Sequence, residues 1–196
     1  MQMLGPQSMA AFLRAGLGLF SILLWIFFAL LIALASGYAG AMVAIHAGWL
    51  NPANLHSDHV TITVNDAEKD ILAWPAITAG FIGAFVAVPA TMVIVRELKA
   101  MFDTFVLNDP FRAENGAHLR IIALALIVIQ VSDFAQYYIE LLLTLLFRRK
   151  DQHEVSLDFS LGGDTLTLWF LIAILFVLAA VFREGAKMRA EQNLTV

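Results

Sequence analysis

The chain has 196 residues, of which 60% are hydrophobic and 14% are charged, and its formal net charge is −4. A soluble globular protein carries more charge than this, so the composition is typical of an integral membrane protein. The sequence contains no cysteine, which excludes disulfides, thiolate metal sites and a cysteine nucleophile.

Four hydrophobic stretches are long enough to cross a bilayer, whose hydrocarbon core of about 30 Å needs about 20 helical residues. We expect a single all-α membrane domain over residues 1–196, built as a four-transmembrane-helix bundle. The predicted spans are residues 17–47, 71–95, 121–147 and 166–182, with a charged loop at 96–120 and a charged helical tail at 183–196. The second helix is expected to continue into the charged loop to about Phe105.

Small residues recur every four positions in the first two spans, a spacing that lets helix backbones approach closely. These rows are interpreted as helix-packing faces. They are Ala33, Gly37 and Ala41 in the first span, and Ala79, Gly83 and Ala87 in the second.

The loops after the first and third spans each contain an alternating stretch typical of a short β-strand, at residues 60–64 and 155–159. Each half of the chain then follows one plan: a span, a loop with a strand, a second span and a charged helix. This order predicts a two-plus-two internal repeat. It also predicts that the two strands pair in a small extracellular sheet, because a lone strand would leave its backbone groups unpaired.

The basic residues predict the orientation of the four spans. The side that holds both termini and residues 96–120 carries eight Lys and Arg residues, and the other side carries four. Since basic loops stay preferentially in the cytoplasm, both termini are expected on the cytoplasmic side.

The third span is the one hydrophobic stretch with acidic side chains in its middle. Its length of roughly 40 Å as a helix places Asp133 near the bilayer midplane. Lipid offers no hydrogen bonds, so the polar side chains of the third span should face other helices or a water-filled cavity. At 100° per residue, Gln130, Asp133, Tyr137 and Glu140 lie within an arc of about 80° on one side of the helix, and Gln136 lies beside this arc. These five side chains form a polar stripe.

Two interpretations of the polar stripe stay open. Asp133 and Glu140, two helical turns apart, would form a site for a proton, a cation or a small amphiphile. Alternatively, both carboxyl groups join helices through hydrogen bonds. The first interpretation makes the protein a small proton, cation or small-molecule transporter.

No motif in the chain predicts an enzyme or a cofactor, because a phosphate-binding glycine loop, a nucleophile elbow and a zinc-protease motif are all absent from the sequence. His56, Asp58 and His59 are the nearest approach to a metal site, but their spacing fits no established motif and favours surface residues. In the charged loop and tail, acids such as Glu97 alternate with bases, which predicts solvated helix faces or a protein-docking surface, and no direct contact with nucleic acid.

Two stretches resemble the motifs of a bacterial family of four-helix membrane proteins: NDPFRAEN at 108–115, followed by HLRII at 118–122, and FREGAKMRAEQNLTV at 182–196. That family is catalogued as a domain of unknown function, and its genes often lie beside one for a small Cro/CI-type helix-turn-helix regulator. The likeness extends over most of the chain. It implies a multi-pass protein of the bacterial inner membrane, regulatory or sensory, that holds or releases this regulator at the cytoplasmic face.

Under this resemblance the charged loop and tail form the docking surface, and the last three residues could add a strand to an edge of the partner. The expected partners are the lipid bilayer and the helix-turn-helix protein, with further copies of the chain in a homo-oligomer. The implied docking residues are Arg112, Glu114, Asn115, Arg120, Arg183, Lys187, Arg189, Leu194 and Val196.

Overall fold

A computed structural model describes residues 9–49, 74–107, 112–147 and 163–193. Four α-helices are long and apolar enough to cross a membrane, which confirms the prediction of an all-helical membrane protein. No strand occurs in these ranges; the predicted strands at 60–64 and 155–159 lie outside them, and the strand pairing and the repeat stay predictions. The helices are α1 (Met9–His46), α2 (Trp74–Val106), α3 (Ala113–Phe147) and α4 (Gly163–Asn193).

The helices extend beyond the predicted spans. Whereas the first span was expected from residue 17, α1 begins at Met9. Helix α2 continues past the span to Val106, which agrees with the expected continuation to about Phe105. With 33 residues, α2 is about 50 Å long, well above the thickness of a hydrocarbon core. Its excess length is the charged part that follows Val95, so α2 carries ordered helix outside the apolar stretch.

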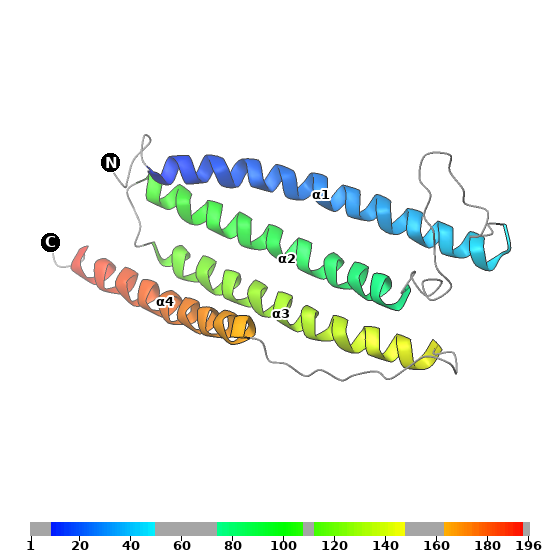
Figure 1. Cartoon of the computed structure of the whole chain (residues 1–196). Coiled ribbons are helices and arrows are strands. Elements are labelled where there is room, and N and C mark those ends of the chain that lie inside the picture. Colours follow the sequence, from blue (N-terminus) through cyan, green and yellow to red (C-terminus); the bar gives the residue numbers. More distant parts are fainter. Residues whose placement is uncertain (1–8, 50–73, 108–111, 148–162, 194–196) are drawn as a thin grey trace.

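The four helices pack in chain order as an open layer. The main contacts join α1 to α2, α2 to α3 and α3 to α4, and the α2–α3 contact is the most extensive. Helices α1 and α4 therefore occupy opposite edges of the layer (Figure 1). Because successive helices alternate in direction, α1 and α3 begin, and α2 and α4 end, at one end of the molecule. We call this the charged end.

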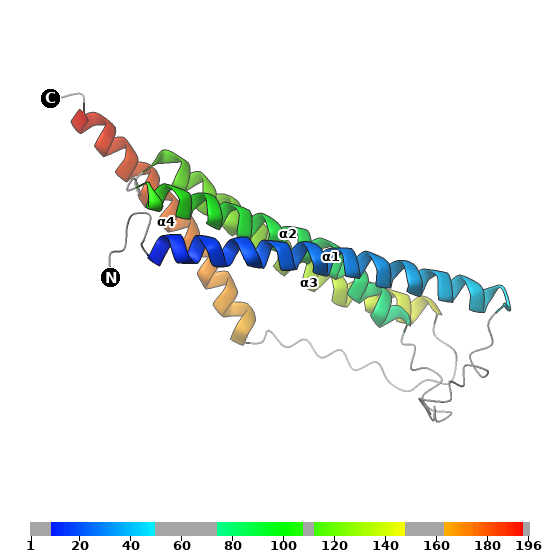
Figure 2. The same ribbon diagram turned by 90° about the horizontal axis from the view of Figure 1, so that it is seen from above.

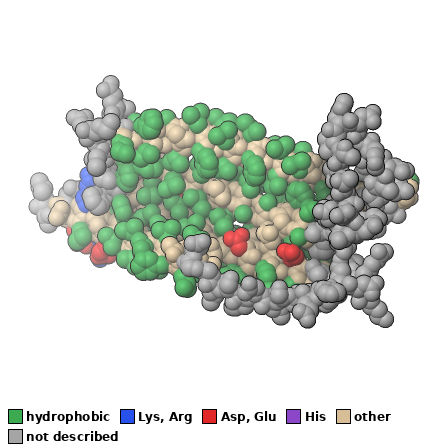
Figure 3. Space-filling model, viewed as in Figure 1, with side chains coloured by type: hydrophobic (Ala, Val, Ile, Leu, Met, Phe, Trp, Pro, Cys, Tyr) green, Lys and Arg blue, Asp and Glu red, His purple; other side chains and the backbone are tan. Residues whose placement is uncertain are grey.

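Much of the layer's surface is hydrophobic (Figure 3). On α1, Leu23 and Trp25 are 61% and 63% exposed. Such a continuous apolar surface suits contact with lipid rather than with water. The inner side of α1 meets α2 through Phe28 and Phe85, whose rings pack edge to face with centroids 6.0 Å apart.

Helices α2 and α3 approach closely at Gly83. A Cβ atom there would lie 3.0 Å from Cδ of Gln136, and Ser132 Oγ donates a hydrogen bond to the Gly83 carbonyl at 3.4 Å. The small-residue row of the second span is therefore a packing face, with Ala79 fully buried. The row of the first span is exposed, and a Cβ atom at Gly37 would meet nothing within 4 Å, so this row contacts no helix of the described structure.

Helix α4 joins the layer near the charged end. Its Ala179 belongs to a buried cluster with Met101, Leu119 and Ile122, and the Ala179 carbonyl oxygen would lie 2.9 Å from a Cβ atom at Gly116. Seen from above, α4 crosses the other helices at an angle, and its first turns lie away from them (Figure 2).

The substitution Gly116→Ala is expected to destabilise the protein by about 1–3 kcal/mol, because the new methyl group meets backbone and separates α3 from α4. The thermal denaturation midpoint of the detergent-purified protein measures this effect. Gly37→Ala is the matched control and should leave the midpoint unchanged or slightly raised. Equal midpoints for the two variants would contradict a tight α3–α4 contact at Gly116.

Candidate functional site

The charged end contains buried polar side chains. Glu97 and Thr104 on α2 are each 5% exposed, and Asn115 on α3 is 0% exposed. Side chains of this kind are stable in a protein interior only when their polar atoms have hydrogen-bond partners. The charged end therefore contains an ordered network of polar side chains that joins α2 to α3.

Glu97 connects α2 to α3. Arg96 Nε and Nη2 donate to Glu97 Oε1 at 2.9 and 2.7 Å, and His118 Nδ1 lies 2.5 Å from Glu97 Oε2. Both carboxylate oxygens thus have a partner. The prediction that Glu97 lies on a solvated face is wrong, because α2 continues as a helix beside α3 and turns this side chain into their interface.

Thr104 and Asn115 form a second link between the same helices. Asn115 Nδ2 donates to Thr104 Oγ1 at 2.8 Å, and the Thr104 hydroxyl donates to the carbonyl of Met101 at 2.7 Å. Asn115 was expected to contact a partner protein. Its complete burial contradicts that assignment, since its amide group holds α3 against α2 instead.

The remaining predicted docking residues within the described ranges are exposed: Arg112, Glu114, Arg120, Arg183, Lys187 and Arg189. Ion pairs between exposed residues join Arg112 to Glu114 at 3.9 Å and Lys187 to Glu184 at 3.8 Å; such pairs contribute little to stability. Leu194 and Val196 lie outside the described residues.

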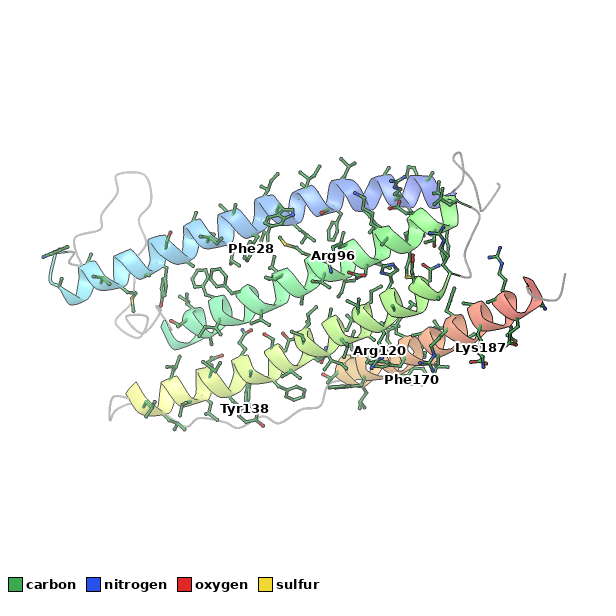
Figure 4. The ribbon with its side chains drawn as sticks, turned by 180° about the vertical axis from the view of Figure 1, so that it is seen from behind. Phe28, Arg96, Arg120, Tyr138, Phe170 and Lys187 are labelled. Carbon is green, nitrogen blue, oxygen red and sulfur yellow. The ribbon has the colours of Figure 1, made fainter. Side chains whose placement is uncertain are left out.

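The last turns of α4 project past the ends of α2 and α3 (Figures 1 and 2). Lys187, on this projection, is far from the apolar middle of the layer (Figure 4). From Lys187 to Gln192 every residue is exposed. This part of the predicted tail is thus helical and accessible on several sides.

At the start of α1, Arg14 Nε lies 2.5 Å from Asp103 Oδ1 of α2. Both side chains are about half exposed. This pair brings the first turns of α1 to the charged end, so all four helices contribute charged residues there.

The polar stripe is not gathered into one site. Gln130 is 7% exposed and Gln136 lies over Gly83 of α2, whereas Asp133 is exposed and Tyr137 is 38% exposed. Acidic side chains interrupt the hydrophobic face over α3 in Figure 3. The prediction that other helices cover Asp133 is therefore wrong for the described structure. Helix α4, the neighbour on that side, departs from α3 before it reaches this level.

Helices α2 and α3 also enclose a groove of about 340 Å³ on one face of the layer. Ser132 and Gln136 are the residues with polar side chains that line it, and no titratable residue does. Its shape and apolar lining suit a hydrocarbon chain and offer no acid–base chemistry. The main lining residues are Ile82, Gly83, Val86, Val128, Val131 and Ile139.

The described residues contain no group of three or more His, Cys, Asp or Glu side chains that could hold a metal ion. His56, Asp58 and His59 lie outside these residues, so the expectation of surface histidines stays a prediction.

Sequence reasoning missed Glu97, Thr104 and His118 as members of a site. Glu97 and Thr104 are seven residues apart and hence share one side of a helix, as do Asn115 and His118, three apart. This spacing was a usable signal that both pairs face inward. It could not show that Glu97 pairs with His118 and that Thr104 pairs with Asn115 across the interface.

The family described as "Protein of unknown function (DUF2975)" matches residues 60–196, a range that includes α2, α3 and α4. No curated protein and no solved structure matches the chain.

The substitution Glu97→Gln is expected to lower the free energy of unfolding by about 1–3 kcal/mol, because the carboxylate accepts at both oxygens whereas the amide accepts at only one, so that either Arg96 or His118 loses its acceptor. Thermal denaturation in detergent measures this loss. Glu184→Gln removes the same charge from an exposed pair and should change stability by less than about 0.5 kcal/mol. A loss of the same size in both variants would refute a special role for the buried carboxylate.

Proposed function

The chain belongs to the DUF2975 family of proteins of unknown function, and from this premise we propose that it is a non-enzymatic regulatory membrane protein that docks a cytoplasmic protein at its charged end. The proposed partner, taken from the resemblance noted in the sequence, is a helix-turn-helix transcription regulator. The proposed location is the bacterial inner membrane, with both termini in the cytoplasm.

One observation carries this proposal: the charged end is held in a fixed shape outside the apolar stretches. A membrane anchor requires only the apolar spans. Here the helices continue further, and buried hydrogen bonds of Glu97 with His118 and of Thr104 with Asn115 join α2 to α3 there. A rigid polar surface of this kind supports binding of a protein, since less conformational freedom is lost when the surface is already ordered.

Exposed charges on α3 and α4 supply the accessible part of the surface. Arg120 and Arg183 are exposed, and neither forms an ion pair among the described residues. Their charges favour a partner that presents acidic groups to the membrane side. The positive-inside tendency supports placing this end in the cytoplasm, where such a regulator resides.

Deleting residues 183–196 is expected to abolish recovery of the regulator when the detergent-extracted protein is purified from its native cells. A chain ending at Asn193 keeps α4 and removes only the last three residues, so it separates docking on the helix from addition of a strand. Thermal denaturation of both truncated chains shows whether they fold. If the folded chain ending at Phe182 recovers the regulator as well as the full chain does, the tail is not the docking element. If the full chain recovers no DNA-binding protein, the proposal is wrong.

A second candidate function, transport of protons or cations, is favoured by the position of Asp133 and Glu140 in the apolar part of α3. It is the weaker candidate, because Asp133 lies on the outside of the layer and not on a path between helices. Proton or cation flux into liposomes tests it. Transport through these carboxyl groups predicts flux that is lost in the double variant Asp133→Asn, Glu140→Gln; docking alone predicts no flux in either protein.

A further inference from the structure

The side of α3 that meets α4 changes character along the helix. Near the charged end this side is apolar, with Leu119 and Ile122 only 7% and 4% exposed, in the cluster that includes Ala179 of α4. Tyr137 and Glu140 follow these two residues after about 18 positions, which is five helical turns, so they occupy the same side. One continuous seam of α3 is thus apolar and covered in one half, and polar in the other.

The polar half of the seam has no cover from α4. Helix α4 starts at Gly163 and diverges from the layer (Figure 2), and Tyr138 lies on the part of α3 that α4 does not reach (Figure 4). As a result Asp133 is exposed and Tyr137 is 38% exposed, both within the apolar stretch. A carboxyl group facing lipid is unfavourable, since acyl chains can neither solvate nor hydrogen-bond it.

No cation of the described residues reaches Asp133. The described Lys and Arg residues of α1, α2, α3 and α4 lie at the charged end, from Arg14, Arg96 and Arg120 outward, and Arg183 follows the apolar part of α4. The groups beside Asp133 on the seam are instead a phenol and a second carboxyl group, from Tyr137 and Glu140. This set contains both hydrogen-bond donors and acceptors, so it can pair with an identical set.

We propose that the polar half of this seam, centred on Asp133 and Tyr137, is the contact surface for a second copy of the chain in a homodimer. Both copies have the same orientation in a membrane, so the two-fold axis lies along the bilayer normal and brings the two α3 helices together in parallel. Asp133 of each copy then lies within about one turn of the Tyr137 hydroxyl of the other. Polar side chains of this kind associate helices within a bilayer.

The geometry also explains why a second α3 suits the surface. The divergence of α4 leaves the outer half of α3 accessible from that side, while α2 and the groove beside Gly83 lie on another side of α3. A helix can therefore approach the seam without displacing α2. The proposal is independent of docking at the charged end, because the two surfaces lie at different levels of α3.

Cysteine cross-linking in native membranes tests the dimer directly, since the chain has no cysteine of its own. The variant Tyr137→Cys should form a disulfide-linked dimer on mild oxidation. Leu142→Cys is the matched control, because Leu142 is 55% exposed and lies about 140° around α3 from the seam at a similar depth. It should form much less dimer. Equal cross-linking of the two variants, or none in Tyr137→Cys, would overturn the proposal, as would a disulfide from Tyr137→Cys to a different membrane protein.

A second pair of variants separates the hydrogen bond from folding. A Glu140→Cys variant keeps the Tyr137 hydroxyl of the proposed contact and should also form a cross-linked dimer. In this background, Asp133→Leu should reduce the cross-linked fraction about three- to tenfold, whereas Asp133→Asn, which keeps hydrogen-bonding groups, should retain most of it. Thermal denaturation in detergent confirms that both proteins fold. An unchanged cross-linked fraction in a folded Asp133→Leu protein would show that Asp133 does not hold the dimer.

Discussion

The contact between α2 and α3 is the interaction on which the rest of the structure depends. It is built in two different ways along its length. In the apolar part, Gly83 lets the backbone of α2 approach Ser132 and Gln136. Beyond the apolar part, Glu97 and Thr104 of α2 bond to residues of α3. Close packing is the main source of helix association inside lipid, and hydrogen bonds replace it where the helices leave the lipid.

The outer helices attach to this pair with fewer constraints. Helix α1 contacts α2 mainly through aromatic rings and the pair of Arg14 with Asp103, and most of its surface remains apolar and exposed. Helix α4 is held near Gly116 and by the buried cluster around Ala179, and only its first turns diverge from the layer. The layer is therefore most tightly packed between α2 and α3, whereas α1 and α4 form edges that lipid or other proteins can contact.

The two ends of α3 consequently present different chemistry. Near the charged end, polar groups are buried and hydrogen-bonded, so they hold α2 against α3 while other charges of α3 and α4 stay exposed. In the other half, Asp133 and Tyr137 are polar and exposed, and none of the four described helices covers them. Stability accounts for the first arrangement without further assumptions. The second is costly in a monomer, which is why it points to a contact between chains.

The sequence by itself determined the membrane class, the number of helices, and the presence of carboxyl groups in the third span. These follow from composition and from the length of apolar stretches, which are local properties of the chain. The continuation of α2 to about residue 105 and the packing role of the row at Gly83 were also readable from the sequence. The actual start of α1 was not, because its first turns are stabilised partly by Asp103 of another helix.

Only the tertiary structure decided which polar side chains are buried and which are exposed. Glu97 and Asn115 are residue types that are usually found on surfaces, but here they are buried, because His118 and Thr104 on the facing helices provide hydrogen-bond partners for their side chains. Asp133 lies on the side of α3 that α4 covers nearer the charged end, yet it is exposed. Whether α4 reaches it depends on the length and tilt of α4. Helical periodicity assigns a side of a helix, whereas the neighbour on that side is set by packing between elements far apart in the chain.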